Sequence, residues 1–137
     1  MTAATVASPA NSIYFGNRLS NVALTPFTLS HAWLTAETDE ANDIVGFGYL
    51  PGGVTVVGML NASADLDSGT ALRQTIKIGS TTVIGTDAGA STGGGFAHWI
   101  TPLVLTAPAE VTVTTTTGAT GHQNGTQYLT FLYYSAQ

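Results

Sequence analysis

From residue 26 onward, apolar and polar side chains alternate with a period of two, the pattern of a β-strand with one buried face. In residues 72–78, the leucine and the two isoleucines share one face with Gln74, while Arg73, Thr75 and Lys77 share the other. A helix would mix these two sets. The alternation predicts eight strands, at residues 27–36, 43–50, 54–64, 70–78, 81–86, 96–105, 111–117 and 127–134.

Turn-forming residues separate these strands. Pro51-Gly52-Gly53 and Asp67-Ser68-Gly69 are typical turn sequences, and Asn124-Gly125 is the strongest short hairpin signal. Short strands with turns at intervals of roughly 8 to 12 residues are typical of sandwiches and barrels. We therefore predict an all-β fold, an antiparallel β-sandwich of the jelly-roll kind with about eight strands.

Residues 1–25 differ from the rest of the chain. They show no periodicity and are rich in alanine, serine, threonine and asparagine. Such a segment buries too little apolar surface to fold alone, so it is either disordered or lies on a partner. We divide the chain into an extended N-terminal arm, residues 1–25, and a β-sandwich domain, residues 26–137.

The composition excludes several classes of protein. Only 8% of the residues are charged, against about 25% in an ordinary soluble domain. The only basic residues are Arg18, Arg73 and Lys77, which are too few and too scattered to bind the phosphates of a nucleic acid. Without cysteine there are no disulfides and no thiolate zinc sites. We expect neither a membrane span nor a secretory signal.

The stretch Asp65-Leu66-Asp67-Ser68-Gly69 is the strongest candidate for a metal loop. A calcium loop of the EF-hand kind needs oxygen ligands at alternating positions and a glutamate at the twelfth. Counted from Asp65, the fifth residue is Gly69 and the twelfth is Ile76. We interpret the stretch as a turn in which an aspartate accepts hydrogen bonds from backbone amides, and we expect no metal or other cofactor. A Ca²⁺ ion held between subunits is the alternative.

The search for catalytic motifs gives no complete set. Residues 89–94 have the glycine spacing of a phosphate loop, but Gly95 stands where a lysine is required, so we predict a flexible loop tip. Candidates for a glycosidase pair are Glu37, Asp39, Glu40 and Glu110, but the first three share one polar loop. We expect a protein without catalytic residues, and a small hydrolase is the alternative.

The last predicted strand, residues 127–134, has aromatic and leucine residues on both faces. A strand that is apolar on both sides is buried on both sides, either in the sandwich or against another subunit. We predict that Tyr128, Phe131 and Tyr133 contribute to an oligomer interface.

Five segments resemble, in order, a family of small virion proteins of tailed bacteriophages, the head decoration or cement proteins. They are residues 42–56 (NDIVGFGYLPGGVTV), 64–72 (ADLDSGTAL), the glycine-rich 89–95, 108–114 (PAEVTVT) and 125–134 (GTQYLTFLYY). The most specific pieces are LPGG and DLDSG. The resemblance spans roughly residues 40–135 and leaves the arm unmatched.

This resemblance implies a structural protein on the outer surface of an icosahedral head, assembled in the host cytoplasm. Its partners would be the major capsid protein and further copies of itself, as a homotrimer, with no nucleic acid and no membrane. In that setting the arm would lie on the shell, where Tyr14, Phe15, Arg18 and Leu19 would bind the capsid. Its function would be to stabilise the head.

A second interpretation is a carbohydrate-binding or host-adhesion module from a tail or fibre. That function predicts a row of exposed aromatic side chains. The candidates are Trp33, Trp99, Tyr128, Tyr133 and Tyr134.

Overall fold

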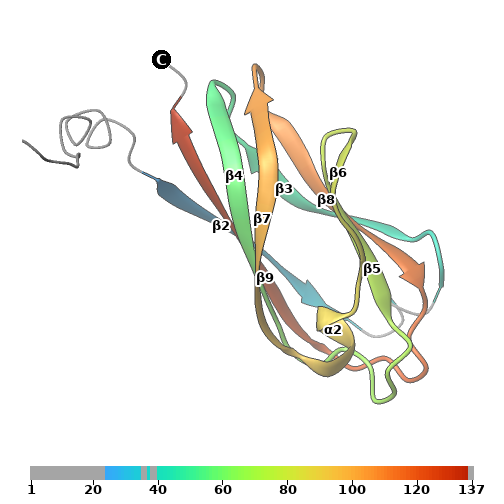
Figure 1. The fold of residues 1–137 in the computed structure, drawn as a ribbon. Coiled ribbons are helices and arrows are strands. Elements are labelled where there is room, and N and C mark those ends of the chain that lie inside the picture. Colours follow the sequence, from blue (N-terminus) through green and yellow to red (C-terminus); the bar gives the residue numbers. More distant parts are fainter. Residues whose placement is uncertain (1–23, 35–36, 38–39, 136–137) are drawn as a thin grey trace, which may run out of the picture.

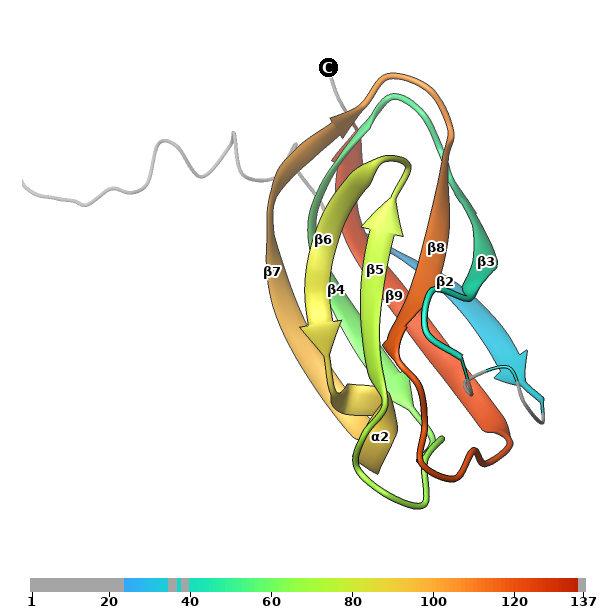
Figure 2. The same ribbon diagram turned by 90° about the vertical axis from the view of Figure 1, so that its right-hand side faces the viewer.

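The computed structural model describes residues 24–34, 37 and 40–135, which form two antiparallel four-stranded sheets packed face to face (Figures 1 and 2). The first sheet has the order β2-β9-β4-β7 and consists of Thr25–Trp33, Gly125–Ser135, Val54–Ser63 and Gly94–Leu105. The second sheet has the order β3-β8-β5-β6 and consists of Ile44–Leu50, Ala109–Thr117, Arg73–Ile78 and Thr81–Asp87.

The strand pairing is nested. Along the chain, the first of the described strands pairs with the last, β2 with β9, and the second pairs with the seventh, β3 with β8. The third and sixth, β4 and β7, pair in the same way, as do β5 and β6 in the middle. All four pairs are antiparallel, which is the arrangement of one long hairpin rolled into two layers, the jelly roll. The predicted fold class is confirmed.

Each predicted strand corresponds to an observed one, with two informative differences at the ends. The strand predicted at 27–36 ends at Trp33. The strand predicted at 70–78 begins only at Arg73. The backbone amides of Ala71 and Leu72 donate to the side chain of Asp67, so these residues belong to a loop and not to the sheet.

The prediction of a loop tip at residues 89–94 is wrong. A one-turn helix, α2 (Gly89–Thr92), forms here, and its first three residues are buried. It is held against the chain that leaves β4, because the carbonyl of Ala90 accepts a hydrogen bond of 2.9 Å from Leu66 N–H. Within the described residues, no helix is long and apolar enough to span a membrane.

The core lies between the sheets and follows the alternation in the sequence. In the run 72–78, Leu72, Gln74, Ile76 and Ile78 are buried, as the pattern predicts. They pack with buried apolar residues of the neighbouring strands and of the opposite sheet, among them Val56, Met59, Val113, Leu129 and Phe131.

A chain of buried polar side chains crosses this core. Trp33 Nε1–H donates to Gln127 Oε1 (3.0 Å), and Gln127 Nε2 donates to Asn61 Oδ1 and Gln74 Oε1, both at 3.0 Å. Asn61 Nδ2 in turn donates to Asp87 Oδ2 at 2.6 Å. Trp33, Gln127 and Asn61 belong to the first sheet, whereas Gln74 and Asp87 belong to the second. Directional bonds therefore fix how the two sheets face each other, which apolar packing alone does less strictly.

Replacing Gln127 by leucine should destabilise the protein by about 3 kcal/mol, because Trp33 N–H and two buried amide oxygens lose their partner. Urea unfolding followed by circular dichroism measures this loss. The matched control is Tyr128→Leu, at a half-exposed position on the same strand, which should change the free energy of unfolding by no more than about 0.5 kcal/mol. Equal unfolding midpoints for the two variants would contradict the proposed role of the buried chain.

Candidate functional site

Two connections meet at the end of the sandwich that lies opposite the start of β2 (Figure 2). The segment between β4 and β5 lies beside the segment between β8 and β9. Ser68 N–H donates to the carbonyl of Gly121 (2.7 Å), and Gln123 N–H donates to the carbonyl of Leu66 (2.9 Å). At Gly121 a Cβ atom would collide with the Ser68 side chain, so glycine allows this close approach. Asp67 lies at the centre of the contact.

The carboxylate of Asp67 accepts four backbone hydrogen bonds. Oδ1 accepts from the N–H groups of Gly69 (2.9 Å) and Gly121 (3.0 Å), and Oδ2 accepts from Ala71 (2.9 Å) and Leu72 (3.0 Å). The residue is fully buried. The prediction that an aspartate of this turn binds backbone amides is confirmed, and one of those amides comes from a segment more than fifty residues away.

These contacts set the charge state of Asp67. Burial by itself raises the pKa of a carboxyl group, because it removes water from the charged form. Here the donors of Gly121, Gly69 and Leu72 outweigh burial and lower the pKa of Asp67 from 3.8 to about 2. The group is therefore a charged acceptor held in place by amides, which is a structural role.

Asp65 has a different environment from Asp67. Its side chain is exposed, and Oδ1 accepts one hydrogen bond of 3.1 Å from Asp67 N–H. In the part of the chain that the structure describes, no three residues among His, Cys, Asp and Glu gather in a way that could hold a metal ion.

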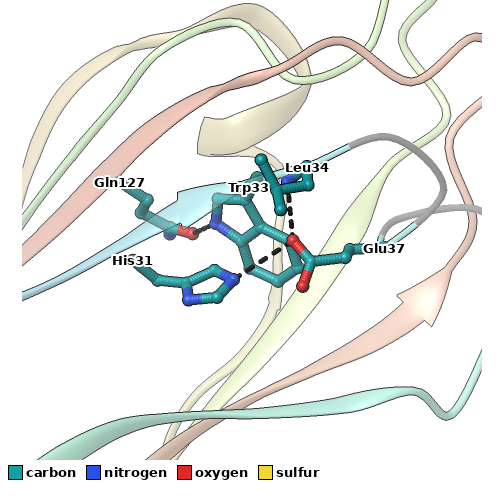
Figure 3. A network of polar contacts seen from close by, with 5 residues as sticks. All are labelled: His31, Trp33, Leu34, Glu37 and Gln127. Atoms are coloured by element: carbon teal, nitrogen blue, oxygen red, sulfur yellow. Dashed lines mark hydrogen bonds and ion pairs between the residues drawn. The ribbon is translucent and has the colours of Figure 1, made fainter.

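A polar and aromatic cluster lies at the end of β2 (Figure 3). Glu37 Oε1 accepts from Leu34 N–H (2.6 Å) and from His31 Nε2 (3.2 Å). The His31 ring stands edge-on to the Trp33 ring, with centroids 4.9 Å apart, and Trp33 is also bound to Gln127. Glu37, a candidate glycosidase carboxylate, therefore fixes the chain as it leaves the strand. Glu110, another candidate, lies on β8 opposite Tyr49.

The two sheets differ in charge. None of the strands β2, β9, β4 and β7 contains an aspartate, glutamate, lysine or arginine. The strands of the other sheet carry Arg73, Lys77, Asp87 and Glu110. We call the outer surface of the sheet β2-β9-β4-β7 the uncharged face.

Large apolar side chains are exposed on the uncharged face. Trp99 of β7 is 83% exposed, Tyr128 of β9 is 48% exposed and Leu60 of β4 is 44% exposed. A shallow depression of about 110 Å³ lies beside the tryptophan, and its lining includes Gly58, Leu60 and Leu132. An exposed apolar surface of this kind, with no charge within it, is typical of an interaction site.

The residues predicted as oligomer contacts have three different positions. Tyr128 lies on the uncharged face. Phe131 is fully buried, so its side chain packs inside the sandwich of its own subunit. Tyr133 packs against the edge of the core, with its ring 6.4 Å from that of Phe27. The oligomer interface itself stays a prediction.

The predicted capsid-binding residues Tyr14, Phe15, Arg18 and Leu19 lie outside the described residues. The depression beside Trp99 was not predicted. Six of the eight predicted strands lack charged residues, and four of those six form this sheet, so the absence of charge in the sequence was only a partial signal for this face.

Solved structures with the same fold are chains of bacteriophage capsids. A chain of the cyanophage Pam1 capsid asymmetric unit has 19% identity and a TM-score of 0.68, over 98% of this chain and 97% of that one. A chain of the capsid of Ralstonia phage GP4 has 21% identity and a TM-score of 0.63, over 84% and 86%. A chain of the acid-stable capsid of Helicobacter pylori bacteriophage KHP30 has 11% identity and a TM-score of 0.57, over 85% and 94%.

The likeness is one of fold. No protein-family profile and no curated protein matches the sequence. At such identities, the shared architecture is the jelly-roll sandwich itself.

Asp67→Asn should destabilise the protein by about 3 kcal/mol. Each carboxylate oxygen accepts two N–H groups, so an asparagine amide would direct its NH₂ group at two donors in either orientation. Urea unfolding at pH 7 measures the effect. Asp65→Asn is the matched control, since its exposed side chain accepts only one of the hydrogen bonds found here, and it should cost less than about 1 kcal/mol.

The wild type and Asp67→Asn, compared at different pH values, give a second test. The pKa of Asp67 is lowered in the folded state, so its contribution is fully present above the ordinary value of 3.8 and is lost as the pH falls through about 2. The gap in free energy of unfolding between wild type and Asp67→Asn should narrow by about 2 kcal/mol from pH 5 to pH 1.5. A constant gap would show that the charge of Asp67 is not what stabilises the loop.

Proposed function

We propose that this protein is a structural component of a bacteriophage virion that binds the outer surface of the head and stabilises the shell. The observation that carries the proposal is the match to the Pam1 capsid chain at a TM-score of 0.68, over nearly the full length of both chains. The two chains are therefore of similar size. The likeness is to a whole small capsid chain, and not to one domain of a much longer protein.

The distribution of charge supports a role in binding a large surface. The uncharged face offers an apolar and hydroxyl-rich area that could be covered without removing water from charged groups. The charged strands lie in the opposite sheet, where they would remain in water. A subunit with two such different faces suits a protein that is bound on one side and exposed on the other.

The arm and the oligomer complete the proposal. The arm, residues 1–25, would lie on the major capsid protein through Tyr14, Phe15, Arg18 and Leu19, and would gain order there. Three copies would close a ring, as identical subunits can through heterologous contacts. Clamping neighbouring capsomers would add binding energy to the shell and resist internal pressure.

A second candidate function is binding of a carbohydrate, as in a tail or fibre module. The observation in its favour is Trp99, a residue that is 83% exposed on the same sheet face as Tyr128. Aromatic rings on a flat sheet can stack on sugars. Binding to a glycan array that disappears in Trp99→Ala would favour this function over the first.

The test of the first function uses heads of the encoding phage that lack this protein. The full-length chain should sediment with them and raise the temperature at which they release DNA. Replacing both Tyr14 and Phe15 by alanine should weaken binding by more than about tenfold, because two large apolar contacts are removed. The control is the double variant Ser8→Ala and Asn11→Ala, which changes polar residues of the same arm.

The outcomes separate the two parts of the proposal. If the wild-type chain does not bind heads, the decoration function is wrong. If it binds but the Tyr14 and Phe15 variant binds equally well, the function stands and the role of the arm is wrong.

Light scattering of the unbound protein should give the mass of three subunits, with and without EDTA. Loss of the trimer on chelation would support the alternative interpretation, in which a Ca²⁺ ion is held between subunits.

A further inference from the structure

The uncharged face has a row of residues that crosses it from edge to edge. Pro26 of β2 pairs with Leu132 of β9, Leu132 pairs with Gly58 of β4, and Gly58 pairs with Trp99 of β7. The Trp99 ring lies close to β4 here, because a Cβ atom at Gly58 would be in ordinary van der Waals contact with it, at 3.4 Å. The depression beside Trp99 lies on this row. The apolar lining of the depression is in contact with water unless another group fills it.

The start of β2 lies one residue from the same row. Thr25, the first residue of β2, pairs with Tyr133, next to the pair of Pro26 and Leu132. The chain before Leu24, residues 1–23, lies outside the described residues. The arm therefore joins the sandwich at the edge of the uncharged face, at the level of the depression.

The arm is long enough to reach the depression. Three strand spacings separate β2 from β7, a distance of about 14 Å. Ten residues lie between Phe15 and Pro26, and the eleven residue-to-residue steps that join them span up to about 36 Å when extended. The large apolar residues of the arm, Ile13, Tyr14, Phe15 and Leu19, can therefore reach the depression.

The charge of the arm matches that of the face. Arg18 is the only charged side chain among residues 1–36. A partner with several charges would bury them against a surface that offers no counter-charge, at a large cost in hydration. A covalently attached segment also acts at an effective concentration in the millimolar range, so even weak apolar contacts suffice to hold it in place.

We propose that in the free protein the arm folds back in cis over the uncharged face, with the aromatic side chain of Tyr14 or Phe15 in the depression beside Trp99. The face is thus a docking surface for an uncharged, aromatic-containing segment, and the chain carries that segment itself. The proposal does not rest on the function in the virion, because it concerns the protein before it meets any partner. A partner that binds the arm would uncover the face in the same step.

The two tryptophans make the contact measurable. Trp33 is 1% exposed and bound to Gln127, so it is out of reach of a quencher in solution, whereas Trp99 reports on the depression. Quenching of tryptophan fluorescence by acrylamide is compared between the full-length chain and its Trp99→Phe variant, and the difference isolates Trp99. The comparison is repeated in the double variant Tyr14→Ala and Phe15→Ala, and in the control Ser8→Ala and Asn11→Ala.

We expect Trp99 to be quenched about threefold less efficiently in the wild type and in the control than in the Tyr14 and Phe15 variant, as for a ring largely covered by its occupant. This protection of Trp99 should not change on dilution. All the proteins should unfold at similar temperatures, because the substitutions leave the sandwich intact. Equal quenching in wild type and variant would overturn the proposal. Protection that is lost on dilution would also overturn it, since the cover would then come from a second copy.

Discussion

The end of the sandwich where the β4–β5 and β8–β9 connections meet depends on a single buried carboxylate. Asp67 accepts four backbone N–H groups, three from its own loop and one from Gly121 in the connection between β8 and β9. These amides would otherwise be buried without acceptors, which a folded chain rarely tolerates. Because the donors outweigh the cost of burial, the pKa of Asp67 falls to about 2 and the charge is retained. The positions of two connections, and of the four strands that they join, follow from this contact.

The sequence allowed much of the fold to be predicted, because the period-two alternation directly reflects which face of a strand is buried. Gln74 shows the limit of that reasoning. Its place on the buried face was predicted, but its bond to Gln127 joins residues fifty-three positions apart, which no local pattern encodes. The same holds for Asp67 and Gly121. The helix α2 was missed because one turn is too short for a periodic signal, and it is fixed by burial against the end of β4.

The candidate interaction surface was only partly predictable. An apolar pattern on both sides of β9 predicted contacts beyond a simple two-layer core, and Tyr128 is half-exposed in the structure. Phe131, three residues later, points the other way and completes the core, because the register with β2 and β4 places it on the inner face. The depression beside Trp99 depends on the pairing of Gly58 with Trp99, which follows from topology. What distinguishes this face is its lack of charge, a property that belongs to the whole sheet.

The pairing of β2 with β9 also determines how the protein bears a mechanical load. Thr25 pairs with Tyr133, so the two ends of the sandwich domain leave it side by side. Tension applied between these ends would unzip the ladder one residue pair at a time, which requires little force. Tension on the arm along the axis of β2 would instead load every hydrogen bond from Thr25 to Trp33 together, in shear. The mechanical resistance of the domain therefore depends on direction. The β2–β9 ladder resists a pull on the arm along β2 far better than a pull that separates Thr25 from Tyr133.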